Sequence, residues 1–165
     1  MFGVIKQGTV KTYDQLKILP GGRDVLIKSI QMHDDPVNES KSPARVGLAV
    51  KGVDADDISR GDVLCSSNFS NIKLATDSIA AGFMKSPYYK GNLTENQTYI
   101  ISLGTQIKPI KIKCINADDD DDDDNDNNTI KIIPEKPFVY FSSQPYALLK
   151  PDNTGTRIIG KGVFQ

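Results

Sequence analysis

The 165-residue sequence contains a single histidine, and this shortage excludes several kinds of catalytic site. With only His33 available, no Ser-His-Asp or Cys-His set can be assembled, which argues against nucleophilic catalysis. Asp34 follows His33 directly in an expected strand, where adjacent side chains point to opposite faces. We therefore expect a polar pair at a strand end there. The sequence also has no G-x-x-x-x-G-K-[ST] motif, so these residues form no P-loop, and we expect no catalytic residues and no enzyme.

Cysteines and long apolar runs are equally scarce. Cys65 and Cys114 lie far apart in the sequence and have no nearby His or Cys, which excludes a disulfide framework and a zinc site. No stretch approaches the roughly 18 apolar residues of a membrane helix, and the N-terminus lacks a signal region. We expect a cytoplasmic protein with no membrane partner.

The charge is unevenly distributed along the chain. The formal net charge is −1, from 20 basic and 21 acidic residues, but eight of the acidic residues lie between Asp118 and Asp126. Without them the chain has a net charge of +7, and the excess lies in residues 68–165, with eleven basic residues against four acidic ones. An anionic partner and an ordinary solvated lysine surface both account for this asymmetry.

Short alternating or β-branched runs, separated by Gly, Pro, Asn and Asp, predict an all-β protein. A phase slip near Lys28 and Ser29 indicates a β-bulge. The spacing of the runs predicts two tandem small antiparallel β-barrels, over residues 1–67 and 68–165. Strands are expected over residues 15–19, 25–32, 45–51, 63–64, 72–75, 98–103, 107–115, 129–133, 138–141, 147–149 and 157–164.

The aspartate run falls between two expected strands and predicts an acidic hairpin tip at residues 117–128. Adjacent like charges repel one another and keep such a segment extended and solvated. The run lacks the glycine turn and ligand spacing of an EF-hand, so we expect no specific metal site.

Cations and aromatic rings alternate around Pro87, where Lys85 and Lys90 flank Tyr88 and Tyr89. Such a segment is typical of RNA contacts, because cations neutralise phosphates and rings stack on bases. For the two tyrosines we favour a different role, as anchors of a loop on the barrel core.

Several stretches of the chain resemble translational GTPases of the elongation factor Tu group. The likeness is to their second and third domains, and within the group to archaeal-type selenocysteine-specific elongation factors and their paralogues. It is carried by residues 28–33 (KSIQMH), 45–53 (RVGLAVKGV), 57–64 (DISRGDVL), 86–91 (SPYYKG) and 156–162 (TRIIGKG). The resemblance implies two β-barrels, in agreement with the strand pattern.

The resemblance also implies a function. In this family a first domain binds and hydrolyses GTP with Mg²⁺, and residues matching that domain are absent from this sequence. Gly3 to Gly8 matches the end of the second strand of domain two, so the first strand of that barrel is expected to be missing. The implied partners are aminoacyl-tRNA, the ribosome and the missing GTPase domain, with no DNA and no cofactor in this chain.

The family pattern assigns candidate site residues one by one. Arg45 matches a position of the pocket for the aminoacyl end of tRNA, where general factors carry asparagine and the selenocysteine type carries arginine. Thr154, Gly155, Thr156 and Arg157 match a loop that approaches the tRNA stem, and Lys90 lies in a second loop expected to face the same RNA backbone. The alternative is a stand-alone β-barrel module that acts as a protein-interaction adaptor and has lost RNA binding.

Overall fold

The computed structural model describes residues 1–114, 128–152, 155 and 157–164, which form two compact units. The units comprise residues Met1–Phe69 and Ser70–Gln165. The described residues form strands and one short 3₁₀ helix, η1 (Ala55–Asp57), so the all-β prediction is confirmed. Within the described ranges, no helix is long and apolar enough to cross a membrane.

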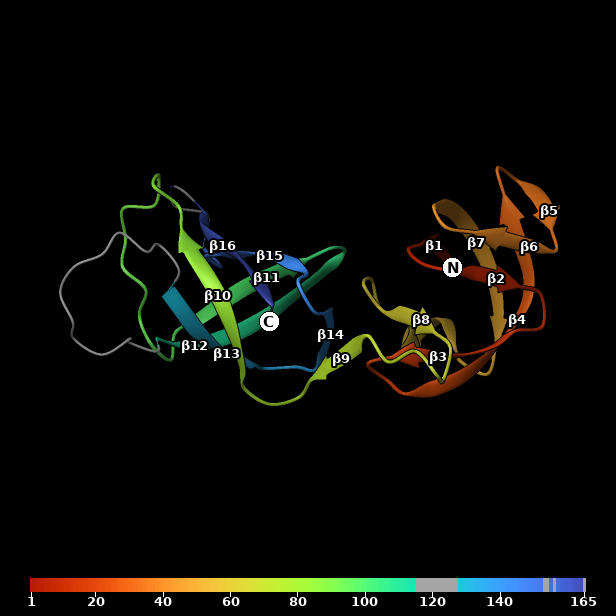
Figure 1. Cartoon of the computed structure of the whole chain (residues 1–165), viewed down its shortest axis with the longest axis horizontal. Coiled ribbons are helices and arrows are strands. Elements are labelled where there is room, and N and C mark those ends of the chain that lie inside the picture. The colour runs from red at the N-terminus through yellow and green to blue at the C-terminus, as the bar shows by residue number, and fades with distance from the viewer. Residues whose placement is uncertain (115–127, 153–154, 156, 165) are drawn as a thin grey trace. The chain divides into compact units, whose positions relative to one another are not determined.

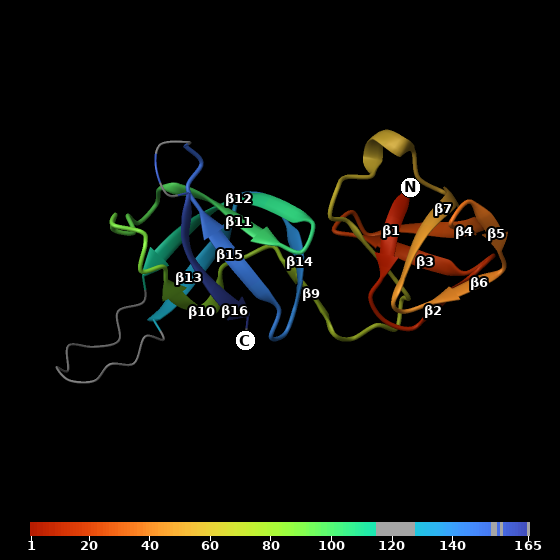
Figure 2. The same ribbon diagram turned by 90° about the horizontal axis from the view of Figure 1, so that it is seen from above.

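The first unit is a curled sheet that forms a half-barrel (Figures 1 and 2). Its strands run in the order β1-β7-β4-β3-β8, β5 pairs with β4, and β2 and β6 form a separate two-stranded ribbon. The strands are β1 (Phe2–Ile5), β2 (Thr9–Lys11), β3 (Gln15–Leu19), β4 (Arg23–Met32), β5 (Asp35–Val37), β6 (Glu39–Lys41), β7 (Ala44–Lys51) and β8 (Val63–Cys65).

The longest strand of this unit, β4, contains the expected bulge. Its register with β7 shifts between Ile27 and Ser29, which confirms the bulge that the phase slip predicted. The slip lets Ile27 and Ile30 both face inward, where they form a buried cluster with Val10 and Val46.

One local expectation was wrong. His33 and Asp34 are not strand residues, because both have positive φ angles, of 53° and 70°, and form the two-residue turn between β4 and β5. Such a turn matches the right-handed twist of the strands it joins. The sequence pattern also missed β1, β2, β5, β6 and β10.

The second unit contains a closed antiparallel barrel with the strand order β10-β13-β12-β11-β15-β16. Two further strands, β9 and β14, pair with each other beside it. The strands are β9 (Ile72–Ala75), β10 (Ile79–Lys85), β11 (Thr98–Leu103), β12 (Gln106–Cys114), β13 (Asn128–Pro134), β14 (Phe138–Phe141), β15 (Pro145–Leu149) and β16 (Ile158–Phe164).

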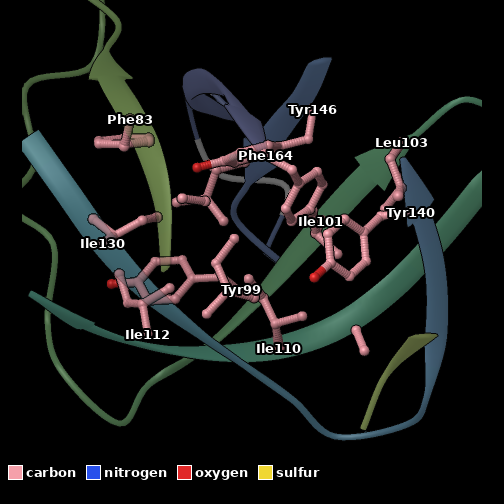
Figure 3. Packing of buried hydrophobic residues seen from close by; sticks show 14 of the residues in the cluster. Phe83, Tyr99, Ile101, Leu103, Ile110, Ile112, Ile130, Tyr140, Tyr146 and Phe164 are labelled. Atoms are coloured by element: carbon pink, nitrogen blue, oxygen red, sulfur yellow. The ribbon is translucent and has the colours of Figure 1, made fainter. Parts of the chain in front are cut away.

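Alternating side chains of these strands fill the barrel interior (Figure 3). On β11, Tyr99, Ile101 and Leu103 are buried while the residues between them are half-buried. The period of two places every second residue on the inner face, where Ile110 and Ile112 of β12 meet them. This cluster of isoleucines and aromatic rings is larger than the core of the first unit.

The barrel closes where β16 packs against β10 and β15 through two glycines. A Cβ on Gly162 would lie 1.9 Å from the carbonyl oxygen of Gly82, and one on Gly160 would lie 2.3 Å from that of Met84. The Tyr146 hydroxyl fills the remaining space and donates a hydrogen bond of 3.1 Å to the Gly82 carbonyl. Burial raises the pKa of this tyrosine above its usual value, which keeps it the neutral donor.

Because every pair in the barrel is antiparallel, three connections leave from one end. This end, which we call the loop end, is where β10, β12 and β15 finish and where β11, β13 and β16 begin. The connections are residues 86–97, 115–127 and 150–157. The predicted acidic tip at 117–128 lies outside the described residues, except for Asn128.

A buried glutamine connects β14 to the barrel. Gln106 is 4% exposed, and its side-chain amide donates to the Val139 carbonyl at 2.7 Å and accepts from the Val139 N–H at 3.1 Å. Both backbone groups of Val139 therefore depend on one side chain for their hydrogen bonds.

We predict that Gln106→Leu lowers the free energy of unfolding by about 2–4 kcal/mol, because it leaves two buried backbone groups unpaired. Urea denaturation followed by far-ultraviolet circular dichroism measures this loss. Gln7→Leu, at an exposed position, is the matched control and should change stability by less than about 0.5 kcal/mol. A loss below about 1 kcal/mol for Gln106→Leu would contradict the assigned role.

Candidate functional site

The structure brings the two predicted loops of the second unit to the loop end. Lys90 lies in the connection after β10, and Arg157 directly precedes β16; Figure 1 shows both strands in the second unit. The bases of these connections are joined, because the Ser86 N–H donates to the Ile159 carbonyl at 2.8 Å. The Lys150 N–H also donates to the Arg157 carbonyl at 2.8 Å. Lys90 and Arg157 are therefore exposed cations at the same end of one barrel.

The other residues predicted for the 154–157 loop are only partly placed. Gly155 is exposed and has a φ of +77°, a left-handed conformation that glycine adopts without strain. Thr154 and Thr156 lie outside the described residues, so their predicted role stays a prediction.

The two neighbouring tyrosines have different surroundings. Tyr89 is 8% exposed and belongs to the barrel core, and its hydroxyl would lie 2.6 Å from a Cβ on Gly91. The Lys85 ammonium lies 5.8 Å from the centre of its ring, a cation–π contact. Tyr88 is 79% exposed. Tyr89 thus anchors the loop, while Tyr88 presents its ring to solvent.

In the first unit, Arg45 lies on β7 beside an exposed apolar surface. It is opposite Val4 of β1, and Gly47, two residues along, is opposite Phe2. Directly opposed residues share a face, and the Phe2 ring lies 3.3 Å from where a Cβ on Gly47 would be. Phe2 is 87% exposed and Val4 is 51% exposed. The guanidinium of Arg45 is thus accompanied by an aromatic ring and an aliphatic side chain.

Sequence analysis missed Phe2 and Val4 as neighbours of Arg45. Their proximity depends on the register between β1 and β7, which no local pattern in the sequence specifies. The alternation of apolar residues in Phe2-Gly3-Val4 was the available signal in the sequence.

The candidate cations are available for a partner. In the described part of the chain the ion pairs are Lys11–Glu39, Lys17–Asp24, Arg23–Asp57 and Lys150–Asp152. None of these pairs includes Arg45, Lys90 or Arg157. Among the described residues of the loop end, Lys90 and Arg157 are therefore exposed cations outside these ion pairs, whereas Asp152 lies 3.5 Å from Lys150 and partly neutralises it.

The described residues bear on two further kinds of chemistry, metal binding and thiol reactivity. Across the described ranges, no group of three or more His, Cys, Asp or Glu side chains could hold a metal ion. Cys65 is a free thiol, and burial raises its pKa while the nearby Lys17 partly opposes that shift. A raised pKa lowers the thiolate fraction and makes this cysteine a poor nucleophile.

Comparison with known proteins identifies the first unit. The family model for elongation factor Tu domain 2 matches residues 1–65. Residues 1–65 form an elongation factor Tu domain 2-like region. The chain is related to selenocysteine-specific elongation factor over 69% of its length and to an elongation factor 1-alpha over 65%.

The relatives extend this likeness beyond domain 2. An uncharacterized protein of Methanocaldococcus jannaschii is 28% identical over 162 residues, which are 98% of this chain and 48% of that protein. The selenocysteine-specific elongation factor of the same organism is 33% identical over 119 residues, covering 69% of this chain and 25% of the relative. The chain thus spans about half, or less, of the length of these relatives.

Solved structures show the same arrangement of strands. The crystal structure of the translation elongation factor SelB from Methanococcus maripaludis, in its apo form, matches 99% of this chain and 39% of its own with a TM-score of 0.81 and 27% identity. The same factor in complex with the GTP analogue GppNHp matches equally well. The elongation factor Tu domain 2-like unit is therefore followed in the sequence by a barrel that the SelB structure matches as well.

We predict that Tyr89→Ala lowers the free energy of unfolding by about 3–5 kcal/mol, because it removes a buried ring from the barrel core. Tyr88→Ala, at the adjacent exposed position, should change it by less than about 0.5 kcal/mol. Thermal or urea denaturation of the two variants side by side measures the difference. Similar losses in both variants would contradict the different surroundings described for the two rings.

Proposed function

We propose that this chain is the tRNA-docking part of a translation elongation factor, which binds aminoacyl-tRNA and contacts the ribosome in the cytoplasm. The observation that carries the proposal is the match of both units to SelB over 99% of the chain, together with loop-end cations that have no ion-pair partner among the described residues. In this proposal GTP binding and hydrolysis, with Mg²⁺, belong to a separate N-terminal domain of the intact protein.

The loop end supports contact with an RNA backbone. Lys90 and Arg157 are exposed, have no ion-pair partner among the described residues, and rise from connections joined at their bases. Exposed ammonium and guanidinium groups bind phosphates and release counterions. The exposed Tyr88 ring adds a surface on which a base or ribose packs.

The Arg45 surface supports a pocket for the aminoacyl end. A terminal adenosine offers a flat base and a phosphate, and the surface offers the Phe2 ring, the Val4 side chain and a guanidinium. The same guanidinium suits a negatively charged aminoacyl side chain, so we assign selection of the aminoacyl group to Arg45. More specifically, we propose that Arg45 selects a selenocysteinyl group.

These residues do not fit a nucleotide triphosphate. The sequence has no P-loop, and among the described residues no group of three or more His, Cys, Asp or Glu side chains could hold a metal ion. No step of GTP hydrolysis is therefore assigned to this chain.

The test is tRNA binding at 50 and 200 mM salt by the full chain and by a Lys90→Glu/Arg157→Glu double variant. We expect the double variant to lose about tenfold or more in affinity at the lower salt concentration, with a shallower salt dependence, because two phosphate contacts become repulsive. The binding constants come from fluorescence anisotropy with labelled tRNA.

The matched control is Lys136→Glu, an exposed lysine that follows β13 at the opposite end of the barrel. It makes the same charge change per residue and should leave affinity nearly unchanged. No binding at low salt, or equal losses in the control, would contradict tRNA docking. The stand-alone adaptor would then be the better account of the two barrels.

A further inference from the structure

The first unit carries a surface cavity of about 360 Å³ that the proposed function does not use. It is lined by Arg23 and residues 50–54, so it lies between the start of β4 and the segment that leads from β7 to η1. Ligand cavities measure about 300–1,000 Å³, and one at the lower limit suits a small molecule. Arg45 precedes Lys51 by six residues on β7, about 20 Å in an extended strand, so the cavity is separate from the Arg45 surface.

A glycine brings the two sides of the cavity together. The φ of Gly52 is +104°, and a Cβ at this position would lie 2.8 Å from the Asp24 carbonyl oxygen. Only glycine fits this close approach between the end of β7 and the start of β4. The Arg23 guanidinium makes an ion pair with the Asp57 carboxylate, which also joins β4 to η1. The cavity is therefore formed by the fold itself, through a backbone contact and an ion pair.

Two opposite charges at the cavity have no partner among the described residues. Lys51 and Asp54 are both exposed, and in that part of the chain neither side chain makes an ion pair or a hydrogen bond. Arg23, by contrast, is neutralised by Asp57. The cavity thus offers one free cation and one free anion, and its charges cancel. A ligand that complements it carries both charges and no net charge.

The rest of the cavity wall is aliphatic. Val50 and Val53 both line the cavity and are half-buried. Among the described residues that line it there is no aromatic ring, so the cavity has no surface on which a base would stack. Two valines beside a lysine and an aspartate suit an aliphatic side chain that is attached to a carboxylate and an ammonium group.

We propose that this cavity binds a free aliphatic α-amino acid. The Lys51 ammonium group donates to the ligand carboxylate, and the Asp54 carboxylate accepts from the ligand ammonium group. Val50 and Val53 contact the aliphatic side chain of the ligand. The inference goes beyond the proposed function and is independent of it, because it uses none of the residues assigned to tRNA.

The experiment is a titration of the isotope-labelled full chain with L-leucine, followed by NMR chemical shifts. Binding should be saturable, with a dissociation constant on the order of millimolar for so small a ligand, and should shift the amide signals of Val50, Gly52 and Val53. Two derivatives each lack one charge: N-acetyl-leucine has no ammonium group, and leucinamide has no carboxylate. Each should bind more weakly than leucine by a factor of about three or more, because one ion pair with an exposed side chain is lost.

Two variants assign the two charges to their residues. Asp54→Asn should weaken the binding of leucine and leucinamide about threefold or more and leave that of N-acetyl-leucine unchanged, because it removes the contact with the ammonium group. Lys51→Gln should weaken leucine and N-acetyl-leucine by the same factor and leave leucinamide unchanged. The matched controls are Asp56→Asn and Lys41→Gln, at exposed positions that do not line the cavity. They make the same charge changes and should leave all three affinities within about twofold.

Several results would overturn the assignment. They are the absence of a saturable shift with leucine, equal binding of leucine and both derivatives, and losses in the control variants as large as those in Asp54→Asn and Lys51→Gln. Shifts confined to Phe2, Val4 and Arg45 would also overturn it, because they would place the amino acid on the Arg45 surface.

Discussion

The second unit depends on the close contact that closes its barrel. β16 approaches β10 and β15 so tightly that only glycine fits at positions 160 and 162, and the Tyr146 hydroxyl completes the seam through the Gly82 carbonyl. Closure leaves none of the six strands with an exposed edge. Every neighbouring pair of strands in the barrel is antiparallel, so three connections leave the barrel at the same end. Lys90 and Arg157 lie at the same end of the barrel because of this geometry.

The first unit positions its candidate residue by a different constraint. Its sheet is open, and β1 is held to β7 by a register that places Val4 beside Arg45 and Phe2 over Gly47. Glycine at position 47 leaves space for the ring, because a Cβ there would lie 3.3 Å from it. The exposed apolar pair on β1 is therefore a consequence of strand pairing, and it gives Arg45 neighbours suited to a base or an aminoacyl group.

Part of this arrangement was predictable from the sequence because β-strands have a period of two. The regular alternation of Thr98 to Leu103 predicted both a strand and its buried face, and the phase slip at Lys28 predicted the bulge. β10 was missed because Ala80, Ala81 and Gly82 contribute little apolar signal, although Phe83 is buried. The sequence could have shown that Gln106 faces the barrel interior, since it has the same strand phase as the buried Ile110 and Ile112.

The neighbours of Arg45 could not be predicted, because the register between distant strands is decided by packing.

The most direct measurement of the central claim, that the loop end faces the RNA, is lysine acetylation with and without aminoacyl-tRNA, read by mass spectrometry. If the account is correct, tRNA reduces the reactivity of Lys90 severalfold and leaves Lys136, at the opposite end of the same barrel, unchanged. Unaltered reactivity at Lys90, or equal protection of both lysines, would contradict it.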